Sequence, residues 1–208
     1  MVGSGFLSAM EVGSLRLVPK LGFIAVLVLG ACSTTPKGQP EESWMEYLKT
    51  LQTLEKAGPP LVEGSDEEHQ AVERFQSLLS DFKAPDFSER ILEVYAEEVF
   101  FNDTIKTLHR VEDLQEYLTA TSEAIDKGTV DFLDVVADNG NYYFRWAMTI
   151  RFKRLARGEE KRSVGMTHVR FDAAGKVVLH QDFWDSVGGL FEHVPALGWV
   201  LRRAKKGL

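Results

Sequence analysis

The sequence has a single cysteine, Cys32, so no disulfide can form within the chain. It also lacks an excess of basic charge: 24 lysines and arginines stand against 31 aspartates and glutamates, and the net charge is −7. A nucleic-acid binder needs a basic face that displaces counterions, so the composition argues against that class. Phosphate-loop, nucleophile-elbow and zinc-ligand motifs are missing as well. We therefore expect no cofactor, no metal and no nucleic-acid partner.

The chain also lacks an apolar run of the roughly 20 residues that a membrane-spanning helix needs. A shorter run, 21–29, follows Arg16 and Lys20 and ends in Leu29-Gly30-Ala31-Cys32. This order of basic, apolar and small residues before a cysteine resembles the lipobox of bacterial lipoproteins. The resemblance implies a signal peptide over 1–31, acylation of Cys32 and a polar tether over 32–41. The alternative is an ordinary signal peptide with a chance cysteine.

Acylation of Cys32 makes the lipid bilayer the expected partner, because two or more acyl chains anchor a protein stably. Ser33 follows the cysteine in place of the aspartate that favours inner-membrane retention in Gram-negative lipoproteins. We therefore expect a cell-envelope protein on the periplasmic face of the outer membrane. The basic residues over 202–206 stand at the end of the expected last helix, where positive charge stabilises the helix C-terminus. The alternative is that they contact anionic lipid head groups.

The remaining chain reads as helices followed by strands. Ser43 and Glu46 form a capping box that opens a helix over 42–60, and we expect that helix to lie outside the main domain. Asn139-Gly140 predicts a tight hairpin. Further helices are expected after Ser65, after Asp86, over 111–122 and near the C-terminus, and strands over 99–101, 130–136, 141–152, 163–171 and 177–185. This order predicts an α+β domain over 65–208.

Two segments resemble a known superfamily. They are residues 95–103 (YAEEVFFND) and residues 167–185, which end in HQDFWD. Both are similar to the nuclear-transport-factor-2-like superfamily, and more narrowly to its SnoaL-like branch of polyketide cyclases, ketosteroid isomerases and limonene epoxide hydrolases. The resemblance implies a curved antiparallel sheet wrapped around the N-terminal helices to form a cone-shaped pocket.

The resemblance also lets family chemistry be tested position by position. The general base of the isomerases falls on Asp103, but their two oxyanion donors fall on Phe75, which cannot donate a hydrogen bond, and on Thr167. The later catalytic aspartate of the epoxide hydrolases falls on Asp182. Their other two catalytic positions fall on Trp146 and Met148, which cannot transfer protons. Both catalytic sets are incomplete.

We therefore expect a pocket that binds a small apolar or amphipathic ligand without catalysis. One alternative is a cyclase, isomerase or hydrolase in which Asp182 is the general base, assisted by His180 or Asp103. Another is a protein-interaction module or homodimer, since this fold often dimerises through its sheet. The expected pocket-lining residues are Phe75, Phe144, Trp146, Met148, Thr167, His168 and Trp184.

His168 and His180 become cross-strand neighbours if Phe171 pairs with Val177. A bulge in this hairpin would instead move His168 to the other face of the sheet.

Overall fold

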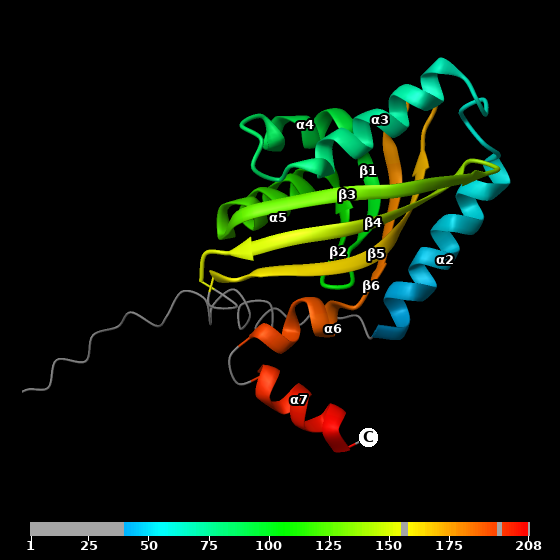
Figure 1. Ribbon diagram of the computed structural model, residues 1–208. Coiled ribbons are helices and arrows are strands. Elements are labelled where there is room, and N and C mark those ends of the chain that lie inside the picture. Colours follow the sequence, from blue (N-terminus) through cyan, green and yellow to red (C-terminus); the bar gives the residue numbers. More distant parts are fainter. Residues whose placement is uncertain (1–39, 155–157, 195–196, 208) are drawn as a thin grey trace, which may run out of the picture. The chain divides into compact units, whose positions relative to one another are not determined.

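The computed structural model describes residues 40–154, 158–194 and 197–207, and helix α2 (Pro40–Ala57) is the first described element (Figure 1). The predicted signal peptide, Cys32 and most of the predicted tether lie outside these residues. The described elements belong to one compact unit, Gly38–Leu208, which contains the entire hydrophobic core described below.

After α2, three further helices precede or interrupt the strands. They are α3 (Asp66–Ser80), α4 (Phe87–Val94) and α5 (Val111–Ala124). The helix predicted after Ser65 is confirmed as α3, and the Ser65 hydroxyl caps it by accepting a hydrogen bond of 3.2 Å from the backbone N–H of Glu68. The Glu68 carboxylate in turn accepts the backbone N–H of Gly64 at 2.6 Å. These two bonds fix where α3 begins.

The six strands form one sheet in the order β2-β1-β6-β5-β4-β3. They are β1 (Tyr95–Asn102), β2 (Thr107–Arg110), β3 (Ile125–Asp138), β4 (Asn141–Phe152), β5 (Glu160–Phe171) and β6 (Val177–Trp184). All neighbours pair antiparallel except β1 and β6, which pair parallel. The expected antiparallel sheet is therefore mixed, although mostly antiparallel. Strand β2 was not expected, and Tyr95 begins β1 instead of ending the preceding helix.

The hairpin between β3 and β4 turns where the sequence predicts it. Asn139 and Gly140 both have positive φ values, 50° and 77°, as the favoured two-residue hairpin turns require. After this turn the alternation of β4 places Tyr142, Phe144 and Trp146 on one face, and all three are buried. We call this the inner face of the sheet.

The hydrophobic core lies between the inner face and helices α3, α4 and α5. Phe75 of α3 is fully buried, and its ring centroid lies 4.7 Å from that of Phe144. Other core members on the helices include Leu78, Ile91 and Leu114. Strand alternation and helix periodicity thus converge on one core, as the sequence pattern indicates.

Helix α2 packs on the outer face of the sheet. Its Tyr47 ring lies near those of Phe100 on β1 and Phe183 on β6, with centroids 6.3 and 6.0 Å apart. Near the end of α2, Arg170 Nη2 donates to the carbonyls of Leu54 and Gly58 at 3.4 and 3.3 Å. These contacts differ from the expectation of a helix outside the main domain, because α2 covers polar side chains that the alternation of β5 directs outward.

The chain after β6 continues into α6 (Ser186–Gly189), the short 3-10 helix η2 (Phe191–His193) and α7 (Leu197–Gly207). Helix α7 is the C-terminal helix that the sequence predicts. It packs chiefly on η2, and η2 packs on α6. This tail therefore leaves the sheet at the end where β6 finishes.

Candidate functional site

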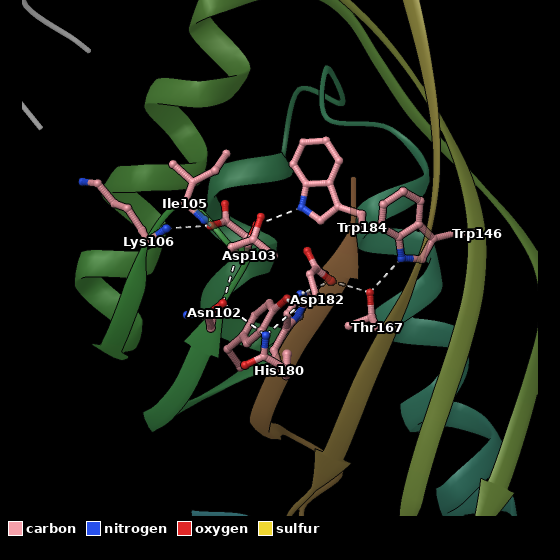
Figure 2. Close-up of polar contacts among 12 residues, drawn as sticks. Asn102, Asp103, Ile105, Lys106, Trp146, Thr167, His180, Asp182 and Trp184 are labelled. Atoms are coloured by element: carbon pink, nitrogen blue, oxygen red, sulfur yellow. Dashed lines mark hydrogen bonds and ion pairs between the residues drawn. The ribbon is translucent and has the colours of Figure 1, made fainter. Parts of the chain in front are cut away.

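Asp182 is the centre of a hydrogen-bonded cluster on the inner face, near the end of β6 (Figure 2). Its Oδ1 accepts the Thr167 hydroxyl from β5 at 2.5 Å and contacts His180 Nε2 at 3.1 Å. Thr167 is directly opposite Asp182 in the β5–β6 register, and His180 is two residues away on the same face. The regular pairing of the hairpin thus brings the three side chains together.

The direction of each hydrogen bond in this cluster follows from its donors. The Trp146 indole N–H can only donate, and it donates to Thr167 Oγ1 at 2.8 Å. The Thr167 hydroxyl proton is therefore free to go to Asp182. On the other side Tyr95 OH lies 3.0 Å from His180 Nδ1. Burial, and then the charge of Asp182, raise the pKa of Tyr95 well above its usual value, so the phenol stays protonated and donates.

With Tyr95 donating to Nδ1, a neutral His180 carries its proton on Nε2 and donates it to Asp182. Two chains of donors, Trp146–Thr167 and Tyr95–His180, therefore converge on one carboxylate oxygen. Such a carboxylate is held in one orientation by its neighbours before any ligand arrives.

The second oxygen of Asp182 has a different environment. No hydrogen bond to Oδ2 is found among the described residues, and the side chain is 17% exposed while that of His180 is almost fully buried. Oδ2 is therefore the acceptor that the cluster leaves available to solvent or to a ligand.

Two tryptophans flank this carboxylate. Trp146 is buried and Trp184 is half-buried, and Met148, also half-buried, follows Trp146 on the same face of β4. Gly165 lies between the two indoles, because a Cβ atom there would overlap the Trp146 ring and lie 2.9 Å from Trp184 Cβ. Gly189 of α6 lies against the Trp184 ring. The surroundings of Asp182 are thus apolar and aromatic.

Asp103 lies across from Asp182 in the turn after β1, and the Trp184 indole donates to its backbone carbonyl at 2.9 Å (Figure 2). Both of its carboxylate oxygens are occupied. Oδ1 accepts the backbone N–H groups of Ile105 and Lys106 at 2.9 and 2.8 Å, and Oδ2 accepts the Tyr117 hydroxyl at 2.5 Å. Burial raises the pKa of Asp103, although these hydrogen bonds lower it in part. Asp103 thus stabilises the turn, and each of its oxygens is already hydrogen-bonded within the protein.

The other predicted pocket residues divide into two groups. Trp146, Thr167 and Trp184 lie around Asp182, whereas Met148 lies further along β4 and pairs with Ser163. Phe75 and Phe144 do not line a pocket: both are fully buried and in contact with each other, so no water-sized space touches them. The part of the predicted cone around Phe75 and Phe144 is thus filled by aromatic rings.

His168 lies on the outer face and not among the pocket residues. Phe171 pairs with Val177 as considered, but the register shifts between Arg170 and Phe171, so that His168 pairs with Gln181 and Val169 pairs with His180. A one-residue shift reverses which face a side chain occupies. The two histidines are therefore not cross-strand neighbours, and His168 contacts Tyr47 of α2 instead.

Sequence reasoning missed two tyrosines of this region. Tyr95 lies before the strand predicted over 99–101, although the β-rich run that follows it favours a strand that begins earlier, as β1 does. Tyr117 carries no signal in the sequence, because a tyrosine on an amphipathic helix is common. Burial and the neighbouring Asp103 charge raise the pKa of Tyr117, so it too stays protonated as a donor.

Other kinds of site find no support among the described residues. Over 40–154, 158–194 and 197–207, no three His, Cys, Asp or Glu side chains are grouped in a way that could hold a metal ion. In the same ranges no helix is long and apolar enough to cross a membrane. Two surface hollows, of about 380 and 330 Å³, lie over helices α3 to α5 and are lined mainly by charged and polar side chains.

Residues 72–180, slightly more than half of the chain, match the protein family described as the SnoaL-like domain. No curated protein sequence is significantly similar to the chain.

Several solved structures share the fold. A protein of ketosteroid isomerase-like fold from Catenulispora acidiphila is 12% identical, with a TM-score of 0.53 over 62% of this chain and 96% of that one. An epoxide hydrolase from M. tuberculosis is 12% identical, with a TM-score of 0.51 over 70% and 96%. A putative polyketide cyclase from Acidithiobacillus ferrooxidans is 17% identical, with a TM-score of 0.51 over 69% and 99%. At these identities the likeness confirms the nuclear-transport-factor-2-like fold and no more.

Proposed function

This chain belongs to the SnoaL-like domain family, and from that premise we propose that it is a lipid-anchored protein of the bacterial envelope whose domain binds a small amphipathic molecule without catalysis. The ligand would lie at the end of the cone near Asp182. Its polar end would be a cation or a hydrogen-bond donor, and its apolar part would contact Trp146, Met148 and Trp184.

One observation carries this proposal. Thr167 and His180 both donate to Oδ1 of Asp182, which leaves Oδ2 as an oriented acceptor beside two indoles. A carboxylate with its donors already in place accepts a further proton donor without reorganising, so the energetic cost of ordering it on binding is small. Apolar surroundings with a few oriented polar groups are typical of small-molecule sites.

The same geometry favours binding over catalysis. General acid–base chemistry on a small substrate usually needs a second group that gives or takes a proton. The nearest other carboxylate, Asp103, is occupied by three donors, and the Thr167 hydroxyl is already bonded to Asp182. Neither family mechanism is completed by these side chains.

The proposal also includes the lipid anchor and the location of the protein in the cell. The site Leu29-Gly30-Ala31-Cys32 after an apolar run supports acylation of Cys32. Ser33, in place of an aspartate, supports a location on the periplasmic face of the outer membrane. The polar segment that follows would tether the domain to the bilayer.

A direct test is a binding titration of the unit Gly38–Leu208 with three eight-carbon probes that differ only in head group: octylamine, octanol and octanoate. Fluorescence reports occupancy in a protein whose exposed Trp44 and Trp199 are replaced by phenylalanine, so that only Trp146 and Trp184 emit. We expect octylamine to bind best and octanoate worst, and Asp182→Asn to weaken octylamine binding by about tenfold or more, since a charge-assisted hydrogen bond is lost. Equal binding of all three probes would contradict the proposal.

Asp172→Asn is the matched control. It makes the same carboxylate-to-amide change at the turn of the β5–β6 hairpin, where the Oδ1 atom accepts the backbone N–H groups of Ala174 and Lys176. An amide oxygen accepts these bonds equally well, so this variant should fold normally and bind octylamine as the wild type does.

A second candidate function is an enzyme in which Asp182 is the general base. The Tyr95–His180 chain behind the carboxylate favours it, because these donors hold Asp182 in one orientation, as a general base requires. Incubation with 1,2-epoxyoctane, followed by mass spectrometry of the products, tests this reading. Hydration that Asp182→Asn abolishes would replace the binding proposal by a hydrolase.

A further inference from the structure

Helix α7 presents apolar side chains to solvent. Trp199 is 61% exposed and Val200 is 52% exposed. The Arg203 guanidinium lies 5.7 Å from the centre of the Trp199 ring, as in a cation–π pair. An exposed indole with a stacked arginine on a surface helix is the combination that suits the boundary between lipid head groups and acyl chains.

The charge of this helix contrasts with that of the whole protein. The net charge of the chain is −7, yet four of the residues over 202–206 are lysine or arginine. Lys205 is paired with Glu192 at 2.5 Å, so its charge is partly compensated locally. Arg203 has its aromatic contact and no described acidic partner. The end of α7 is thus complementary to an anionic surface.

The first turns of α2 expose apolar side chains as well. Trp44 is 55% exposed and Met45 is 45% exposed. Tyr47, one turn on, packs against Phe183 near the end of β6. The chain leaves β6 directly into α6, η2 and α7, which pack on one another in that order. The exposed residues of α2 and α7 therefore belong to the same end of the sheet.

The chain between Cys32 and the start of α2 at Pro40 is short. Eight residues, fully extended, reach at most about 28 Å. A lipid attached at Cys32 would hold this end of the domain within that distance of the bilayer. This step rests on the anchor in the proposed function, whereas the exposed residues of α2 and α7 do not depend on it.

We propose that Trp44 and Met45 of α2, together with Trp199, Val200 and Arg203 of α7, form a surface that docks on an anionic lipid bilayer. The indoles insert at head-group level and Arg203 contacts lipid phosphate. One short helix binds a bilayer weakly, so this surface acts as a second contact beside the acyl anchor and orients the domain. Asp182, two residues before the end of β6, then lies at the end of the sheet nearer the membrane.

Vesicle flotation of the unit Gly38–Leu208 tests this surface in the absence of the anchor. The probes are vesicles of phosphatidylglycerol with phosphatidylethanolamine, and vesicles of phosphatidylcholine alone. We expect binding to the anionic vesicles that weakens as salt is added, and little binding to the neutral ones. The double variant Trp199→Ser, Val200→Ser should reduce binding by about tenfold, and Arg203→Glu by about fivefold.

The matched control is the double variant Leu133→Ser, Val136→Ser, which removes two equally exposed apolar side chains from β3. All these positions are exposed, so the variants should melt as the wild type does. The docking surface is refuted if the α7 variants float as the wild type does, if the β3 variants lose binding equally, or if no vesicle binds. Acylation of Cys32 is tested separately, by fractionating cells that express the full chain with Cys32→Ser. The docking surface can therefore be refuted without refuting acylation, and acylation without refuting the docking surface.

Discussion

Tyr47 and His168 lie 121 positions apart in the sequence, and the Tyr47 hydroxyl is 2.9 Å from Nδ1 of His168. Burial raises the pKa of Tyr47 to about 12, so its phenol is protonated and donates this hydrogen bond. His168 therefore carries its proton on Nε2, which lies 3.0 Å from Asn141 Oδ1. Burial, and then the nearby Arg170 charge, lower the pKa of His168 to about 4. A neutral histidine thus joins helix α2 to the sheet.

This link makes the stability of the domain sensitive to acid. The pKa of His168 is about 4 when folded and about 6.5 when unfolded, so its contribution is complete above pH 6.5 and is lost as the pH falls toward 4. We expect His168→Gln to remove on the order of 2–3 kcal/mol of that pH dependence. Urea unfolding of both proteins between pH 7 and pH 4 measures it. Identical pH slopes would show that His168 does not titrate in this way.

Removal of α2 should destabilise the domain. Without residues 38–60, Arg170 loses the carbonyls of Leu54 and Gly58, and His168 loses Tyr47. Both side chains become exposed to water when α2 is removed, so each lost hydrogen bond costs its net value of about 0.5–1.5 kcal/mol. The packing of Tyr47 on Phe100 and Phe183 is lost as well. Thermal melts of chains that begin at Gly38 and at Leu61 test this. A shorter chain that melts at the same temperature would restore the view of α2 as an appendage.

Asp103 should tolerate loss of its charge better than loss of its shape. In Asp103→Asn the amide oxygen can still accept the N–H groups of Ile105 and Lys106, and the amide N–H can donate to Tyr117. We expect that variant to change the free energy of unfolding by less than about 1 kcal/mol, and Asp103→Ala to cost about 2–3 kcal/mol. Because the folded pKa of Asp103 is raised, the wild type should lose stability as the pH rises through that pKa, and the Asn variant should not. Equal losses for Asn and Ala would mean that the charge itself is required.

The sequence predicts the fold where one local rule acts alone. The alternation over 141–152 and the Asn139-Gly140 turn gave β4 and its hairpin correctly, because period-two burial and left-handed turn residues leave few alternatives. The helix start predicted after Ser65 is correct in the same way, because the Ser65 hydroxyl caps α3. Local sequence patterns could not predict the parallel pairing of β1 with β6, because it joins segments about 80 residues apart.

The candidate site was predictable only in part, for a related reason. Strand alternation placed His180, Asp182 and Trp184 on one face, and the structure brings Thr167 and Trp146 to the same carboxylate. The bulge beside Arg170 moved His168 to the outer face, and nothing in the hairpin sequence specifies that bulge. Phe75 was placed on a pocket wall by resemblance, but packing against Phe144 makes it core.

The lipid anchor is testable in cells. We expect Cys32→Ser to abolish acylation and processing, because the thiol is the group that takes the diacylglycerol at a site of this kind. The variant should then keep its uncleaved segment, while the wild type appears as a shorter, lipid-bearing form in the outer-membrane fraction. Mass spectrometry of the N-terminus distinguishes the two. A wild-type protein that is cleaved at the same place without acyl chains would indicate an ordinary signal peptide.

The central claim is that Asp182 holds the polar end of a small amphipathic ligand. The most direct measurement is native mass spectrometry of the mature protein purified from its own host, for the wild type and for Asp182→Asn. We predict that the wild type retains a small molecule with a cationic or hydrogen-bond-donating end, and that Asp182→Asn folds normally but loses it. A wild type without any retained molecule that also fails to bind octylamine, or an Asp182→Asn variant that retains the same molecule at the same occupancy, would contradict the account.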